Sequence, residues 1–306
     1  MILCCGEALI DFMPVKTADG DIAFQPFNGG SIYNVAIALG RLGQDVGYFG
    51  GLSNDFFGDM IGNELANSNV DISLSIKSAR ATTLAFVKFN DGQPEYVFLD
   101  EGSAGRMLSD DQMLEILDEV DLLHFGSISL INNPAASMFE KLAAREKGRR
   151  LISIDPNIRP SLVSNESDYR ARLERMFSFA DIIKISDEDL KWLYPGVSHK
   201  NCASRWLSEK TTLVVITKGA KGATAYAGDN IIEQAIESVD VVDTVGAGDT
   251  FMAGLLFALG EAGILSSGKF NTINQAMISN ALSFASRIAA ITVSRTGANP
   301  PWEHEI

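Results

Sequence analysis

Residues 239–259 read VDVVDTVGAGDTFMAGLLFAL, and this stretch decides the fold. The valines of residues 239–243 predict the end of a buried strand. The small residues at 246–248 then allow backbone to approach a ligand closely. Apolar residues recur at helical spacing after Asp249, so a helix is expected to begin at or near it. The stretch therefore predicts a strand, a tight turn and the start of a helix.

An aspartate at the mouth of such a turn suggests chemistry. Unpaired N–H groups and the positive end of the helix dipole converge at a helix start and bind anions. A carboxylate placed beside a bound phosphate could take a proton from a hydroxyl that attacks the phosphorus. The alternative is that Asp249 is a helix N-cap, worth about 1 kcal/mol, and that the glycines only make the turn.

The composition is that of an ordinary globular protein, with 306 residues, 46% hydrophobic and 21% charged. The formal net charge of −14 argues against nucleic acid or an anionic membrane as the main partner, because phosphate contacts need clustered Lys and Arg. Three cysteines offer neither a disulfide framework nor a metal-ligand spacing. No apolar run reaches the roughly 18 residues of a membrane span, so cytoplasmic residence is expected.

Strands and helices are expected to alternate along most of the chain. A buried strand is expected at 1–12, and further strands at 121–125, 151–154, 181–185 and 212–217. Helices are expected near 31–43, 59–67, 110–117, 134–147 and 167–178, and from 187 onward. Repeated strand–helix–strand units with short connections predict one α/β domain with a doubly wound, mostly parallel sheet and helices on both faces.

A hairpin interrupts this alternation. Residues 82–89 and 95–99 alternate between apolar and polar side chains and flank Asn-Asp-Gly at 90–92. A polar segment before the first helix alternates as well. Together they predict a small separate sheet, a lid, formed by insertions at about 13–28 and 82–104 in a single domain that spans the chain.

Several polar residues are expected at the edge of the sheet where ligands bind, outside the carboxyl ends of the strands. Asp11 closes the first predicted strand, and Gly29, Gly30 and Asn34 open the first helix, for which Ser31 is the expected cap. Carboxylate and amide groups can bind vicinal hydroxyls, and glycine leaves room for a sugar ring. The alternative is that Asp11 caps a turn and Asn34 is an exposed helical residue.

DTVGAGDTFMAGLL resembles the C-terminal signature of the PfkB-type sugar kinases, the ribokinase superfamily, and within it the chain most resembles bacterial fructokinases. The resemblance implies a ribokinase-like fold in which Asp249 is the catalytic base. It also implies that the backbone amides of Gly246, Ala247 and Gly248 bind charge on the transferred phosphoryl group. GEALIDF and the later GG and NVA segments resemble the N-terminal signature, whose matching aspartate, glycine and asparagine hold the sugar.

The segment DPNIR at 155–159 also follows a predicted strand. Its arginine could bind phosphate bidentately or make a surface ion pair of little value. The segment resembles the fructokinase-type DPNxR motif, which implies that Asn157 and Arg159 line the active site. The tryptophan that often follows is absent, which weakens the assignment of a ketose more than that of a kinase.

Lys184 and Ser186 occupy the place of the family's Asn-x-x-Glu motif, which orders Mg²⁺ and phosphate through water. Asp189 replaces the glutamate and is one methylene shorter, so Asp189 and Glu188 both stay candidates for the metal. The alternative is an acidic helix N-terminus favoured by the helix dipole.

The resemblance implies further groups for the nucleotide and a cation. Thr217, Gly219 and Gly222 resemble the nucleotide-side TxGxxG loop, and Asn280 belongs to a helix that resembles the adenine-side wall. Positions that match a monovalent-cation site in some members are Asp243, Val245, Thr292, Arg295 and Gly297, which makes potassium a hypothesis.

The expected activity is ATP-dependent phosphorylation of a sugar's primary hydroxyl with Mg²⁺, foremost fructose to fructose 6-phosphate. Ribose, 2-keto-3-deoxygluconate and aminoimidazole riboside are alternative acceptors. A hypothesis of another class is a catalytically silent regulator that binds a sugar or nucleotide, although the intact Asp249 and its glycines argue against it. The exposed lid sheet could pair with a second copy, so a homodimer is also a hypothesis.

Overall fold

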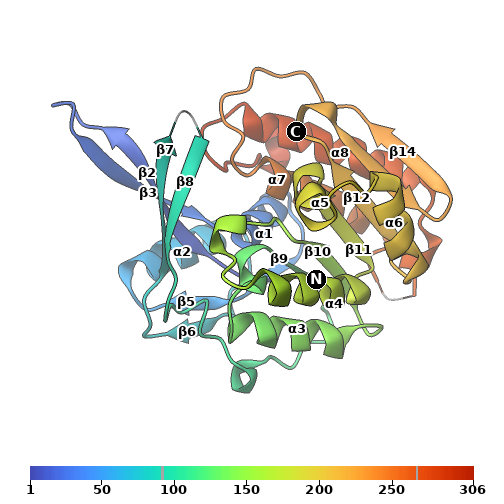
Figure 1. The fold of residues 1–306 in the computed structure, drawn as a ribbon, viewed down its shortest axis with the longest axis horizontal. Helices are drawn as coiled ribbons and strands as arrows, with labels where there is room; N and C mark the ends of the chain where they lie inside the picture. The colour runs from blue at the N-terminus through green and yellow to red at the C-terminus, as the bar shows by residue number, and fades with distance from the viewer. Residues whose placement is uncertain (91–92, 267) are drawn as a thin grey trace.

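The computed structural model describes residues 1–90, 93–266 and 268–306. A central sheet lies between two layers of helices, and a second, smaller sheet stands away from it (Figure 1). The strands of the central sheet, in spatial order, are β14 (Asn230–Gln234), β13 (Ala223–Ala227), β12 (Leu213–Thr217), β11 (Ile182–Ser186), β10 (Leu151–Asp155), β9 (Leu122–Gly126), β1 (Ile2–Cys5) and β4 (Val46–Phe49).

The central sheet is mostly parallel, as predicted. All strand pairs from β12 to β4 are parallel, and β13 pairs antiparallel with both β12 and β14. The parallel strands are short and apolar and are buried on both faces, which is typical of a parallel sheet covered by helices.

The helices cover the two faces of this sheet in separate groups. One face is covered by α1 (Ser31–Arg41), α7 (Ala247–Glu261) and α8 (Gln275–Val293). The other face is covered by α3 (Ala135–Glu146), α4 (Glu166–Phe179), α5 (Asp187–Leu193) and α6 (His199–Ser208). By length and composition α8 could cross a membrane, but it packs along α7, with Leu282 and Ala285 fully buried in the core between the helices and the sheet.

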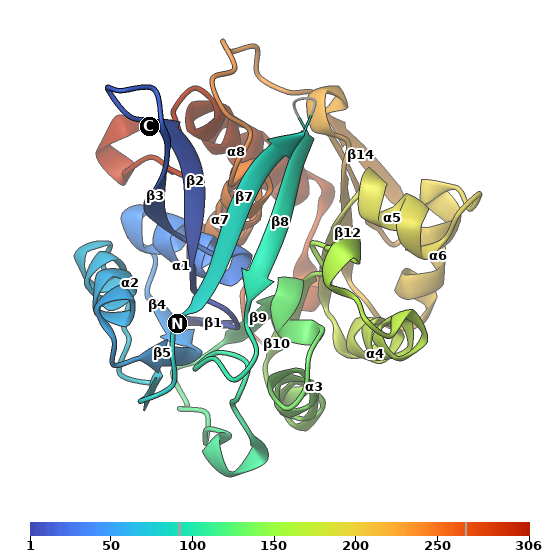
Figure 2. The same ribbon diagram turned by 60° about the vertical axis from the view of Figure 1, so that its left-hand side comes forward.

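The predicted small separate sheet is present; we keep the name lid for it, and its closing over a ligand stays a prediction. Its strands, in spatial order, are β3 (Ile22–Gly29), β2 (Leu9–Lys16), β7 (Thr83–Asn90) and β8 (Gln93–Leu99). The hairpin of β7 and β8 is confirmed, although part of its predicted turn, at 91–92, lies outside the described residues. The β2–β3 ribbon projects from the body of the molecule in Figure 1, and Figure 2 shows all four strands side by side. Beside the lid lie α2 (Phe56–Asn67) and a two-stranded sheet of β5 (Gly51–Ser53) and β6 (Ile76–Ser78).

The prediction of one strand over 1–12 is wrong, because the chain leaves the central sheet after Cys5. At Gly6 a Cβ would lie 2.5 Å from both Ile32 and Ser129, so the backbone passes close to α1 there. The chain then enters the lid as β2. Asp11 is therefore a residue of the lid and does not close a strand of the central sheet.

The predicted strand at 239–243 is also wrong. This segment is irregular, and Val241 and Val242 are 64% and 61% exposed. The amides of Val242 and Asp243 both donate to the carbonyl of Val293, at the end of α8, rather than to a neighbouring strand. A β-branched composition favours a strand only where a neighbouring strand offers partners.

The predicted helix near 110–117 is reduced to one 3₁₀ turn over Asp110–Gln112. Ser109 caps this turn, and the backbone of Met113 is already extended, with ψ 124°. Met113, Leu114 and Ile116 then pack on the core beside α3 without forming a helix.

Candidate active site

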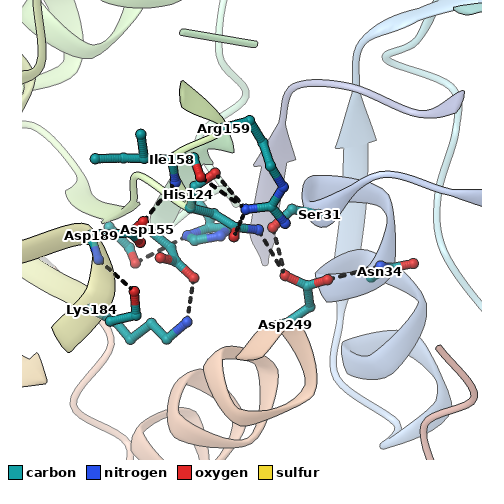
Figure 3. A network of polar contacts seen from close by, with 12 residues as sticks. Ser31, Asn34, His124, Asp155, Ile158, Arg159, Lys184, Asp189 and Asp249 are labelled. Carbon is teal, nitrogen blue, oxygen red and sulfur yellow. Dashed lines mark hydrogen bonds and ion pairs between the residues drawn. The ribbon is translucent and has the colours of Figure 1, made fainter. Parts of the chain in front are cut away.

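Asp249 belongs to a polar cluster that brings together side chains of α1, α7, β11 and the loop after β10 (Figure 3). Its side chain is buried, at 7% exposure. Ser31 Oγ donates to Oδ1 at 2.6 Å, and Asn34 Nδ2 donates to Oδ2 at 2.8 Å. Asn157 Nδ2 reaches Oδ1 at 3.5 Å, the long limit of a hydrogen bond. These donors, from α1 and from the loop after β10, fix the orientation of the carboxylate.

The start of α7 differs from the prediction by two residues. The N-cap is Gly246, in the left-handed region with φ 75°, so Asp249 lies in the first turn and is not the cap. A Cβ at Gly246 would meet Ala298 Cβ at 2.6 Å, so this position needs glycine for both conformation and space. Ala247 N donates to Thr244 O at 3.3 Å, whereas within the described chain the amides of Gly248 and Asp249 have no acceptor. The two unpaired N–H groups can bind an anion, and the carboxylate beside them can accept the proton of a hydroxyl that reacts with this anion.

The lid brings a second carboxylate to this cluster. Asp11 extends over Gly29, where a Cβ would lie 2.2 Å from Asp11 Oδ2. Gly30 follows with φ 106° and is the N-cap of α1, so Ser31, the predicted cap, is the first helical residue. The pKa of Asp11 is raised to about 6, chiefly by burial, while Arg159 lowers it and Asp249 contributes to the rise.

The DPNIR segment crosses the cluster at the carboxyl end of β10. Asn157 has a left-handed backbone, with φ 38°. The guanidinium of Arg159 donates to Asn157 Oδ1 at 2.7 Å and to two carbonyls of the same segment. Arg159 is thus folded onto its own loop, and its charge lies close enough to Asp11 to lower the pKa of that carboxyl. The alternative of a simple surface ion pair does not fit this arrangement.

Lys184 reaches from β11 to the start of α7. Its Nζ donates to Asp155 Oδ2 at 2.6 Å, and both side chains are buried. A Cβ at Gly248 would lie 3.1 Å from Nζ. An ammonium group and the positive end of a helix therefore face the same point, an arrangement that is stabilised when an anion binds there.

The two candidate metal ligands at the start of α5, Glu188 and Asp189, differ in their surroundings. Ser186 is the N-cap and accepts a hydrogen bond from Asp189 N at 3.0 Å. Asp189 points into the cluster, where Oδ1 accepts from Ile158 N at 3.1 Å, whereas Glu188 is exposed. Burial, and after it the charge of Asp155, raise the pKa of Asp189 to about 6. One inward carboxylate suits Mg²⁺, which usually keeps several waters and phosphate ligands.

The predicted nucleotide loop follows β12. Thr217 ends the strand, and Gly219 and Gly222 have φ 53° and 80°. A Cβ at Gly222 would lie 2.0 Å from Gln234 O, so the turn packs tightly on β14. Asn280 is exposed on α8.

The predicted cation positions are partly brought together at Asp243. Its Oδ1 accepts from Val245 N at 3.0 Å and its Oδ2 accepts from Gly297 N at 2.9 Å, so these three residues come together. The carbonyl of Thr292 accepts the amide of Arg295, and the guanidinium of Arg295 binds Glu305. Both oxygens of Asp243 thus accept backbone amides, so the described contacts do not by themselves form a cation site.

Sequence reasoning missed several residues of the cluster. Ser31 was expected to cap a helix, and Asp155 received no role. Tyr96 and Phe98 of the lid were also missed. The strand register puts Phe98 beside Ala85 and Ala85 beside Asp11, so these aromatic rings share the Asp11 face of the lid. Only the alternation of the hairpin could have indicated them, and alternation does not tell which face looks inward.

Comparisons with known proteins agree on one family. The model of the pfkB family carbohydrate kinases matches residues 1–305. A fructokinase of Rhizobium leguminosarum bv. trifolii is 45% identical over 280 residues, covering 92% of this chain and 86% of that protein. Two crystal structures are each 28% identical to this chain. They are a Xylella fastidiosa fructokinase with bound ATP (TM-score 0.89, covering 97% of this chain and 93% of that one) and a Vibrio cholerae fructokinase with fructose, ADP and calcium (TM-score 0.83, 97% and 94%). With Asp249 at a glycine-capped helix start under a β lid, the chain belongs to the pfkB family of carbohydrate kinases.

Proposed function

We propose that this protein transfers the γ-phosphoryl group of ATP to the primary hydroxyl of fructose, giving fructose 6-phosphate and ADP. The observation that carries the proposal is the buried carboxylate of Asp249 beside the unpaired amides at the start of α7. The 45% identity to a bacterial fructokinase supports fructose as the acceptor. The ATP, ADP and fructose in the fructokinase structures support this pair of substrates.

Asp249 acts as general base in the proposed reaction. The sugar binds between the lid and α1, held by Asp11, Asn34 and the room that Gly29 and Gly30 leave. The carboxylate of Asp249 takes the proton of the hydroxyl as its oxygen attacks the γ-phosphorus, and ADP leaves on the opposite side. The lid excludes water, which would otherwise be phosphorylated in place of the sugar.

The phosphoryl group is stabilised from the other side of the cluster. The backbone N–H groups of residues 246–248 donate hydrogen bonds to its equatorial oxygens and stabilise the negative charge there. Gly248 is best placed to do so, because its N–H is unpaired within the described chain. Lys184 and Ser186 contact the phosphates, and Arg159 and Asn157 line the sugar side. The loop with Thr217, Gly219 and Gly222 and the exposed Asn280 flank the rest of the nucleotide.

Cations complete the site. Asp189 is the better candidate than Glu188 to hold Mg²⁺ through water, because only Asp189 faces the cluster. When bound, Mg²⁺ neutralises charge on the phosphates. Potassium is proposed at Asp243 and the carbonyls near Gly297. We also place the enzyme in the cytoplasm, where ATP is abundant, and propose a homodimer joined through the lid.

The test is ADP release with a panel of sugars. We expect fructose to give the highest kcat/KM, ahead of ribose, 2-keto-3-deoxygluconate and aminoimidazole riboside. Asp249→Asn should lower kcat by about 10²- to 10⁴-fold while ATP still binds, because an amide cannot take the proton. Glu261→Gln, at the exposed far end of the same helix, is the matched control and should stay active.

The outcomes separate the proposal from its rivals. Near-normal turnover of Asp249→Asn would remove Asp249 as the base. A higher kcat/KM for another sugar of the panel would replace fructose as the substrate. Sugar binding without ADP release from any sugar would instead indicate the silent regulator.

A further inference from the structure

The ammonium of Lys184 is held at a place where a positive charge is unfavourable without an anion. Lys184 is 4% exposed, and its Nζ would lie 3.1 Å from a Cβ at Gly248, in the first turn of α7. The N-terminal end of a helix carries a partial positive charge, which opposes a buried cation at this point. A partner is therefore needed that holds this amine in place.

Asp155 is the residue placed to do so. It ends β10 and lies beside Lys184 of β11, because Ser153 pairs with Ile182 and the two strands run parallel. Asp155 Oδ2 accepts from Lys184 Nζ at 2.6 Å. Asp155 is 1% exposed, and its other oxygen, Oδ1, has no partner within the described residues. Burial raises the pKa of Asp155, whereas Lys184, which donates the hydrogen bond to Oδ2, lowers it.

The neighbouring His124 does not compete with Lys184 as a cationic partner of Asp155. His124 of β9 is fully buried, with Nδ1 at 3.2 Å from Ser153 Oγ, and Nε2 has no partner in the described chain. Burial, and after it the charge of Lys184, lower the pKa of His124 to about 3, so the imidazole is neutral at physiological pH. Asp155 and Lys184 therefore form a pair without a competing cation from β9.

We propose that Asp155 is a positioning residue that acts through Lys184, holding the ammonium at the start of α7, where charge develops on the transferred phosphoryl group. The inference rests on the proposed kinase reaction and adds a residue to it. Asp155 itself does not touch the substrates. The rival explanation is a purely structural ion pair, which a pair of polar or apolar residues could replace without loss of turnover.

The experiment is a double-mutant cycle on the full enzyme with Mg²⁺, ATP and fructose. Asp155→Asn should lower kcat by about 10- to 100-fold and raise the KM for ATP, while the KM for the sugar stays within about twofold. Lys184→Met should lower kcat at least as much. Because Asp155 acts through Lys184, adding Asp155→Asn to Lys184→Met should change kcat by less than about twofold.

Two further variants keep the outcome interpretable. Asp155→Ser leaves room for water and serves if the asparagine variant fails to fold; it should show the same loss and the same coupling. Asp181→Asn is the matched control, because Asp181 accepts the Ile152 amide at the opposite end of these strands. It should lower the melting temperature but leave kcat and the KM for ATP near wild type.

The possible results distinguish the inference, the proposed function and a structural ion pair. Losses that multiply in the double variant, or an Asp155 variant with wild-type kcat, would overturn the inference while leaving the kinase proposal intact. A folded wild-type enzyme that releases no ADP with any sugar would instead overturn the proposed function. A loss confined to thermal stability would identify a structural ion pair.

Discussion

Asp11 illustrates at the scale of one residue how a buried carboxylate can cost stability. Burial is the main cause that raises its pKa from the ordinary value of 3.8 to about 6; Arg159 opposes this rise and Asp249 supports it. The folded protein therefore binds a proton on Asp11 more tightly than the unfolded chain does. As pH rises from about 4 through 6, ionisation favours the unfolded chain, and this contribution to the free energy of unfolding decreases.

We predict that Asp11→Asn stabilises the unliganded protein at pH 8 and impairs catalysis. The free energy of unfolding should rise by about 1 to 3 kcal/mol at pH 8, and this gain should vanish near pH 4. The kcat/KM for the sugar should fall, because the amide is a weaker acceptor for sugar hydroxyls than the carboxylate. Urea unfolding at several pH values and steady-state kinetics measure both effects.

Asp21→Asn provides the control, since Asp21 is exposed in the turn between β2 and β3. It should leave both the stability and the kinetics unchanged. An Asp11→Asn protein that is less stable than wild type at pH 8 would show that its contacts outweigh the cost of burying its charge.

At the scale of elements, the start of α7 depends on a glycine for two separate reasons. Gly246 has φ 75°, and its missing Cβ makes room for Ala298. Gly263, just after the other end of α7, has a similar φ of 69°, but a Cβ added there would meet no atom within 4 Å. The two glycines thus share the backbone requirement and differ only in the contact.

Gly246→Ala should therefore cost more than Gly263→Ala. Both lose about 1 kcal/mol of stability because alanine is strained at positive φ. Gly246→Ala adds a collision at 2.6 Å, which must shift the first turn of α7 or the loop at Ala298. We expect a larger drop in melting temperature and a lower kcat for this variant, measured by thermal unfolding and ADP release. Equal effects of the two variants on kcat would show that the amides of this turn tolerate displacement.

The elements that could be predicted from sequence are those that carry their own signal. The same apolar patterns that predicted these elements make up their buried faces in the structure. This holds for the short apolar runs of β9 to β12 and for the periodic helices α1, α3 and α4. The two wrong strand predictions have a common cause. Whether a segment forms a strand, and in which sheet, depends on which strands lie beside it. Residues 239–243 have the composition of a strand but lack a strand to pair with among the described residues, and the run at 1–12 divides between two sheets.

At the scale of the whole molecule, the site is assembled from segments distant in sequence. Asp249 accepts hydrogen bonds from Ser31 and Asn34, which lie 218 and 215 positions away. The sequence could identify Asp249, Asn34 and Asp11 as polar residues in recognisable motifs. It could not identify the contact of Ser31 with Asp249 or the pairing of Asp155 with Lys184, because both follow from how α1, α7 and the strands pack in three dimensions.

The two faces of the lid differ in a way that bears on assembly. The face with Asp11 and Phe98 looks toward the site, whereas the opposite face presents apolar side chains to solvent. By strand register these include Ile22, Phe24, Val97 and Leu99, which are 74%, 45%, 59% and 56% exposed. Exposed apolar clusters of this kind mark interaction surfaces more often than chance. The strands β3 and β8 at the edges of the lid also leave backbone groups open to pairing.

We therefore predict that Val97→Lys combined with Leu99→Lys converts a dimer into a monomer, as measured by light scattering after size-exclusion chromatography. Charge on both copies would repel across the interface, whereas each monomer keeps its fold because these side chains are already exposed. Val241→Lys with Val242→Lys is the control, because it places the same charges on exposed valines outside the lid. If the wild-type protein already has the mass of one chain, the apolar face serves no dimer; if the lid variant stays dimeric, the two copies meet elsewhere.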